Sequence, residues 1–145
     1  MKEDYRSRES VLSALSSGEN DFSAQNLSEL DLSGITFPEN CDFTSADLSN
    51  ADIRNASVNA ALFRGARIYD MIACYADFTG SNFYNAYANR SDFRNANLSD
   101  CDLFEMSVAR AHFDAQVLAW LPSAIGYGAR TPHYSVLTLS ESSIQ

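Results

Sequence analysis

The chain has 145 residues and a net charge of −9, with 10 Lys and Arg residues against 19 Asp and Glu residues. This length suits a single domain with a real hydrophobic core, and 46% hydrophobic with 20% charged residues excludes a disordered chain. Such an acidic chain is a poor candidate for binding nucleic acid directly, because affinity for phosphates comes from cationic side chains. We therefore expect a protein partner.

The start of the chain predicts its location. No apolar stretch reaches the roughly 18 residues that a membrane span needs. The first residues, MKEDYRSRES, carry charges of both signs and lack the apolar region of a signal peptide. We expect a cytoplasmic protein that does not contact a membrane, with a non-cleaved export signal as an open alternative.

Residues 1–19 are predicted to form an N-terminal capping segment. Val11, Leu12 and Leu15 recur at helical spacing, and Gly18 supplies a stop. The segment predicts a short amphipathic helix that covers the exposed edge of the structure that follows.

Residues 20–118 carry an internal repeat with a period of five. The central residues of the units are mostly large and apolar: Phe43, Leu48, Ile53, Val58, Phe63, Ile68, Ala73, Phe78, Phe83, Ala88, Phe93, Leu98, Leu103, Val108 and Phe113. Two positions before each central residue lies a second series, nearly all of it small, such as Ala46, Ala51 and Ala56. This period fits neither the 3.6 residues of a helical turn nor the alternation of a strand.

A chain that turns a corner once per unit places every fifth residue inside. Four units would close a square coil, and the next coil would stack about 4.8 Å above so that backbone groups pair between coils. Residues twenty apart then form columns, and Met71 would fill the gap that Ala73 leaves. The central residues from Phe22 to Phe37 keep the period of five but are shifted by one residue relative to the series that begins at Phe43. One extra residue near Pro38 is therefore predicted to form a bulged corner.

Segments such as SADLSNADIRNAS and RSDFRNANLSDCDLF resemble the pentapeptide repeat proteins. The resemblance implies an all-β fold, a right-handed quadrilateral β-helix of about five coils. The two ends of such a β-helix have unpaired backbone groups, and we expect short helical caps to cover them. Four residues replace the Asp or Asn usual before the central residue, and they predict irregular corners: Leu62, Arg67, Ile72 and Tyr87.

Residues 119–145 are predicted to form a C-terminal cap and tail. Four apolar residues precede Pro122 and predict a helical turn or two over the last coil: Val117, Leu118, Trp120 and Leu121. The same surface is a candidate for a homodimer contact, because relatives that dimerise do so through C-terminal elements. Residues 132–139 alternate weakly and could add an edge strand or stay mobile.

No pattern in the sequence predicts catalysis, a cofactor or a metal. Cys41 and Cys101 fall in inward slots three coils apart, roughly 14 Å, and cannot form a disulfide. Cys74 points outward, about 10 Å from His112, which is too far for a Cys–His pair. The Cys and His spacings do not match a zinc site, and the recurring Asp residues are explained by hydrogen bonding at the corners.

The outward positions suggest where a partner binds. Aromatic and apolar residues, with one arginine beside them, map to two neighbouring faces: Leu62, Arg64, Tyr69, Tyr84, Tyr87 and Phe104. This cluster predicts either a protein-binding surface or a docking site for the chain's own C-terminus. Ile72 and Tyr75 lie on the next face. From Glu9 to Ile53 there is no Lys or Arg, so the first coils are strongly negative.

These features favour a non-enzymatic protein-binding scaffold that presents flat faces. The alternative is an acidic, DNA-mimicking rod that binds a type II topoisomerase such as DNA gyrase, as some relatives do. A weaker alternative is the docking domain of a secreted bacterial effector.

Overall fold

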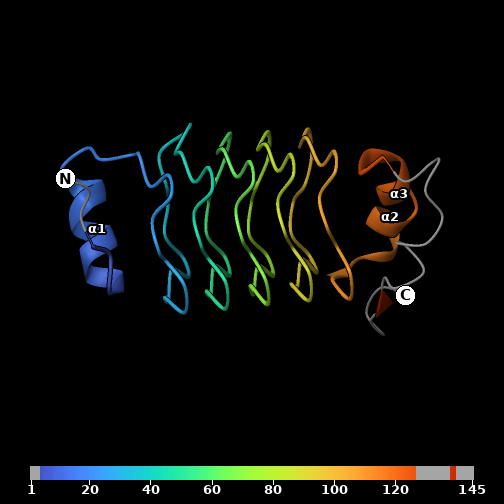
Figure 1. The fold of residues 1–145 in the computed structure, drawn as a ribbon, viewed down its shortest axis with the longest axis horizontal. Coiled ribbons are helices and arrows are strands. Elements are labelled where there is room, and N and C mark those ends of the chain that lie inside the picture. The colour runs from blue at the N-terminus through green and yellow to red at the C-terminus, as the bar shows by residue number, and fades with distance from the viewer. Residues whose placement is uncertain (1–3, 127–137, 140–145) are drawn as a thin grey trace.

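A stack of similar turns lies between helices at the two ends of the molecule (Figure 1). The computed structural model describes residues 4–126 and 138–139. Its elements are α1 (Arg8–Ser16), β1 (His112–Phe113), α2 (Ala115–Leu118), α3 (Leu121–Ala124) and β2 (Thr138–Leu139). Of residues 132–139, for which a weak alternation is predicted, residues 132–137 lie outside the described residues.

Short parallel bridges, one per five-residue unit, hold consecutive turns together. From Asp42 onward each bridge joins residues twenty apart, as in the column Asp42, Leu62, Asn82 and Asp102. Four units therefore make one turn, as the period predicts. In each unit up to the one centred on Phe93, the central N–H donates to the turn above, for example from Phe43 to the carbonyl of Leu62 at 2.7 Å.

The first turn is one residue longer than the others. Asp21 bridges Asp42 and Thr36 bridges Ser57, so these partners are 21 residues apart. The extra residue lies between Thr36 and Asp42, which confirms the bulged corner predicted near Pro38. Asn40 takes the left-handed conformation there, with φ 65°.

Each corner needs one residue with left-handed backbone, and non-glycine residues at these positions have φ between 54° and 65°. The Asp or Asn before the central residue stabilises the corner by accepting the N–H two residues later. Asn82, for example, accepts from the N–H of Tyr84 at 2.9 Å. This bond explains why Asp and Asn recur in the sequence.

The irregular corners predicted at the four departures from the repeat are wrong. Leu62, Arg67, Ile72 and Tyr87 all form the regular bridges to the turns below and above. The reason is that main-chain hydrogen bonds set the path of the chain, and the side chain before the central residue points outward.

The core is a set of columns of buried side chains. Phe22, Phe43, Phe63 and Phe83 stack in series, with ring centroids 5.6, 4.9 and 4.7 Å apart. Met71 and Ala73 are both fully buried in the same unit, consistent with Met71 filling the space beside Ala73. Ser81 is also buried, and its hydroxyl donates to the Val58 carbonyl at 2.7 Å.

Helix α1 covers the first turn. It begins after Ser7, whose side chain accepts from the Ser10 N–H in a reciprocal capping arrangement. Val11 and Ala14 are buried, whereas Leu12, expected on the inner side, is 41% exposed because it lies on the opposite side of the helix.

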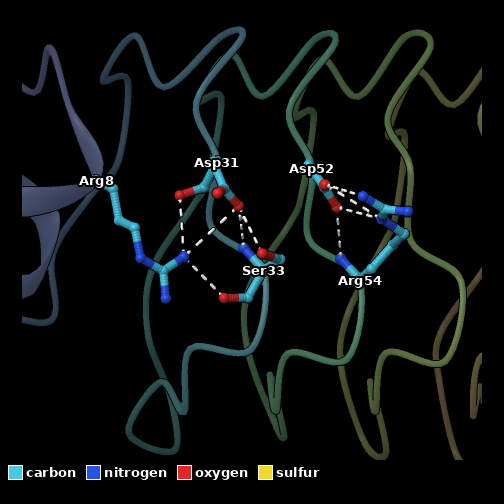
Figure 2. Close-up of polar contacts among 5 residues, drawn as sticks. All are labelled: Arg8, Asp31, Ser33, Asp52 and Arg54. Atoms are coloured by element: carbon cyan, nitrogen blue, oxygen red, sulfur yellow. Dashed lines mark hydrogen bonds and ion pairs between the residues drawn. The ribbon is translucent and has the colours of Figure 1, made fainter.

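Polar contacts fix α1 against the first turn. The Arg8 guanidinium donates to the carbonyl of Ser33 at 2.7 Å and lies 3.6 Å from the Asp31 carboxylate. Figure 2 shows this contact beside the Asp52–Arg54 pair of the next turn. The N-terminal helix is therefore held by packing and by one arginine.

Helices α2 and α3 cover the other end, where the last repeat unit is centred on Phe113. The predicted helical turns around Val117 to Leu121 are present as α2 and α3, and α2 begins at Ala115, within the range 20–118 assigned to the repeat. Strand β1 pairs in parallel with β2, His112 with Thr138. No helix in the described ranges is long and apolar enough to cross a bilayer.

Replacement of a central phenylalanine tests the stacked core. Phe63→Ala removes a fully buried ring between Phe43 and Phe83 and should cost about 3–5 kcal/mol of unfolding free energy. Thermal unfolding followed by circular dichroism should show a clearly lower midpoint. Thr44→Ala, in an outward position of the neighbouring turn, is the control and should leave the midpoint nearly unchanged.

Candidate functional site

The predicted protein-binding residues lie on two adjacent faces of the stack that meet at one corner. Consecutive units form adjacent faces, so Leu62 and Arg64 belong to the first face and Arg67 and Tyr69 to the second. Residues twenty positions later continue both faces on the next turn. We call the six predicted residues the aromatic patch: Leu62, Arg64, Tyr69, Tyr84, Tyr87 and Phe104.

On the first face, three side chains of the aromatic patch stack across successive turns. The Arg64 guanidinium carbon lies 5.3 Å from the centroid of the Tyr84 ring. The Tyr84 and Phe104 rings are stacked, with centroids 6.2 Å apart and planes 13° from parallel. A cation–π contact at an exposed site contributes about 0.5–1 kcal/mol, so this ladder holds its side chains in place.

On the second face, an ion pair braces the aromatic side chains. Tyr69 and Tyr87 lie with ring centroids 6.0 Å apart, and the Arg90 guanidinium is 6.0 Å from the Tyr69 ring. Arg90 also donates from Nε and Nη2 to the carboxylate of Asp70 at 3.0 Å. Sequence reasoning did not identify the roles of Arg90 and Asp70, although their spacing of twenty was the available signal.

Half of the aromatic patch is open to solvent in the described part of the chain: Arg64, Tyr87 and Phe104 are exposed. Tyr87 is 44% exposed and Arg64 is exposed, while Leu62, Tyr69 and Tyr84 are half-buried. Phe104 is 47% exposed but contacts the end of the C-terminal cap. A Cβ on Gly126 would lie 2.7 Å from its ring, so the Gly126 backbone packs directly against Phe104.

The four C-terminal candidates for a cap or dimer contact divide by burial. Val117 and Leu121 are buried against the last turn, and Leu118 is partly buried. Trp120 is 40% exposed. Packing within the chain therefore accounts for Val117, Leu121 and part of Leu118, and Trp120 is the member with most surface to offer a partner.

Ion pairs neutralise much of the charge in the middle turns. Arg54 pairs with Asp52 at 2.7 Å, Arg94 with Asp92 at 2.6 Å and Arg90 with Asp70 at 3.0 Å. The hydrogen bonds from Arg54 lower the pKa of Asp52. The carboxylates of the first turn, including Asp21, Glu29 and Glu39, are exposed.

The cysteines do not form a reactive centre. Burial raises the pKa of the Cys41 thiol to about 12 and that of Cys74 to about 11. The Cys74 thiol contacts Asp92, and the buried Nδ1 of His112 has no hydrogen-bond partner among the described residues. Within the same residues, no group of His, Cys, Asp and Glu could hold a metal ion.

An open depression of about 870 Å³ lies beside the C-terminal cap. Its lining includes Tyr75, Leu98, Asp114, Gln116 and Trp120. Ser99, Asp100 and Cys101 also line the depression, but burial raises the pKa of the Cys101 thiol to about 11, and this thiol donates to the Phe78 carbonyl at 3.1 Å. The aromatic patch is therefore the better candidate for a functional site.

The thiol environment predicts slow chemical modification. A protonated thiol is a poor nucleophile, and raised pKa values keep Cys41 and Cys74 protonated at pH values near 8. Reaction with dithiobis-nitrobenzoate should be much slower for the folded chain than for the chain in urea. Rapid reaction of one thiol in the folded chain would contradict this prediction.

Comparison with known proteins supports the repeat architecture. The sequence matches the profile of pentapeptide repeats in eight copies, over residues 26–65, 41–72 and 73–105. No curated protein sequence matches the chain.

Solved structures that resemble the chain include two cyanobacterial proteins. One is HetL, a pentapeptide repeat protein involved in heterocyst differentiation regulation from the cyanobacterium Nostoc sp. strain PCC 7120. It is 25% identical with a TM-score of 0.55, over 74% of this chain and 45% of HetL. The pentapeptide repeat protein Rfr23 from the cyanobacterium Cyanothece 51142 is 22% identical with a TM-score of 0.51, over 65% of this chain and 64% of Rfr23. The chain thus spans less than two thirds of either relative, and the likeness shows a right-handed β-helix solenoid.

Proposed function

Since this chain belongs to the pentapeptide repeat family, we propose that it is a non-enzymatic scaffold that binds a protein partner through the aromatic patch. Proteins of this family are generally structural or interaction proteins. In this proposal the rod is a quadrilateral β-helix of about five coils. Its partner meets the two faces that join at residues 64–67.

The observation that carries the proposal is a set of aromatic side chains where the repeat normally places polar ones. Tyr84 and Tyr87 replace small or polar residues on two adjacent faces, and both keep accessible surface. Tyr and Arg are enriched where proteins bind one another, because a large ring or guanidinium gives much contact area and has a polar end. Exposed aromatic clusters of this kind mark interaction sites.

The rigid support of these side chains favours binding. The units of the middle turns are hydrogen-bonded to the turns on both sides, and Arg64 and Arg90 pack against the Tyr84 and Tyr69 rings. A surface that is already ordered loses little conformational entropy when a partner binds. The faces offer contact area, and the described part of the chain brings no catalytic constellation onto them.

Removal of two tyrosines tests the aromatic patch. Tyr84→Ala with Tyr87→Ala should weaken binding of a partner, first captured by affinity purification and then purified, by about tenfold or more. The thermal midpoint should change little, because both side chains point outward. Tyr75→Ala, an exposed tyrosine on the next face, is the control. Unchanged affinity, or a large loss of stability, would argue against the proposal.

A DNA-mimicking rod that binds DNA gyrase is the second candidate function. Exposed carboxylates of the first turn, with no Lys or Arg between Glu9 and Ile53, favour it. The ion pairs of the middle turns weigh against it, because a mimic needs negative charge along most of its length.

A supercoiling assay separates the two functions. If the protein binds through the aromatic patch and does not mimic DNA, addition of the purified chain should leave gyrase supercoiling and its inhibition by quinolones unchanged. Inhibition, or protection from the drug at low protein concentration, would favour mimicry. Glu29→Gln with Asp31→Asn should then weaken the effect, because these substitutions remove negative charge from the first turn.

A further inference from the structure

The corner between the two faces of the aromatic patch combines two arginines with two tyrosines. Arg64 and Arg67 lie on either side of the corner that contains Gly65. Twenty residues later, on the next turn, Tyr84 and Tyr87 lie on either side of the corner that contains Asn85. We call these four residues, Arg64, Arg67, Tyr84 and Tyr87, the corner site.

The charges of the corner site are only weakly compensated. Residues 62–69 and 82–89 contain Arg64 and Arg67 as their charged residues and no Asp or Glu. Among the described residues Arg64 has no ion pair, and its guanidinium lies over the Tyr84 ring. Arg67 is 3.6 Å from the Asp47 carboxylate, a longer contact than the 2.6–3.0 Å of the other pairs in these turns. Its side chain is 54% exposed.

Carboxylates border the corner site on both sides. Asp42 and Asp47 belong to the turn before it, and Asp102 and Glu105 to the turn after it. The site is thus a small positive area on a chain of net charge −9. Because adjacent turns are about 4.8 Å apart, the positive area has room for one or two carboxylates and not for a long acidic run.

The shape of the corner lets a partner approach the two guanidinium groups. Gly65 has φ 63° and no side chain, and a Cβ there would meet only the Ser45 hydroxyl at 3.6 Å. Nothing large therefore separates Arg64 from Arg67 at the corner. An arginine binds a carboxylate by donating two parallel N–H hydrogen bonds to its oxygens, and the rings of the next turn offer apolar area beside it.

From this juxtaposition we propose that the corner site binds a short acidic segment of the partner protein, in which one or two Asp or Glu residues adjoin an apolar or aromatic residue. The carboxylates pair with Arg64 and Arg67, and the apolar residue packs on Tyr84 and Tyr87. The neighbouring carboxylates repel longer acidic segments and so fix the register. This inference rests on the proposed function and names the chemistry of the partner.

Selection of short random peptides on the full chain tests the inference. Peptides displayed on phage should be enriched in Asp or Glu beside aromatic or apolar residues. A selected peptide, labelled with a fluorophore, should lose affinity about tenfold or more for the variant Arg64→Gln/Arg67→Gln. Its affinity should also fall as salt rises, because exposed charges are screened.

A matched variant controls for net charge. Arg54→Gln/Arg110→Gln also removes two exposed positive charges, but from another face and from the last turn, and should leave affinity within about twofold. Thermal midpoints of both double variants show whether the fold is kept.

The outcomes separate this inference from the proposed function. Peptides that lose affinity for Tyr84→Ala/Tyr87→Ala but not for Arg64→Gln/Arg67→Gln would overturn the inference and leave the proposed function standing. Peptides insensitive to both double variants would contradict both. Failure to select any peptide, or displacement of the peptide by inorganic phosphate at the same concentration, would overturn the inference.

Discussion

The structure depends on the main-chain hydrogen bonds between residues of successive turns. In most units below the last turn, the central residue and the residue at the corner both donate to the turn above, as Phe63 and Gly65 do, and every unit repeats the same left-handed corner. Because these bonds do not use side chains, the outward residues are free to vary without a change in the path of the chain. Leu62, Arg67, Ile72 and Tyr87 show this freedom, since they interrupt the polar pattern and keep the regular bridges.

Packing inside the tube restricts the size of the inward residues, whereas the outward residues are less restricted. A column of stacked phenylalanines needs one large residue in every fourth unit, and the neighbouring slot must be small enough for the turns to close. In one unit a large Met71 lies beside a small Ala73, so a large residue in the slim slot can accompany a small central residue. The tube is consequently filled by side chains, and function has to lie on its outside.

On the outside, spacing of twenty residues brings together side chains that are far apart in the sequence. This spacing creates the Arg64–Tyr84–Phe104 ladder and the Asp70–Arg90 pair. It also places the two arginines of one turn beneath the two tyrosines of the next. The binding proposals follow from this small positive and aromatic area on an acidic rod. On the next face, by contrast, the arginines are paired with carboxylates, as in Asp52–Arg54 and Asp92–Arg94.

The sequence by itself determined the inward columns, the bulge near Pro38 and the faces on which the aromatic residues lie, because a strict period maps directly onto a regular stack. The tertiary structure decided what covers each face. The burial of Val11 but not Leu12 depends on how α1 rotates against the first turn, and the contact of Gly126 with Phe104 depends on where α3 ends. The brace of Asp70 and Arg90 depends on rotamers across two turns. The repeat period specifies whether each side chain points inward or outward. The contacts named above depend instead on how side chains and helices pack against one another, which the period does not specify.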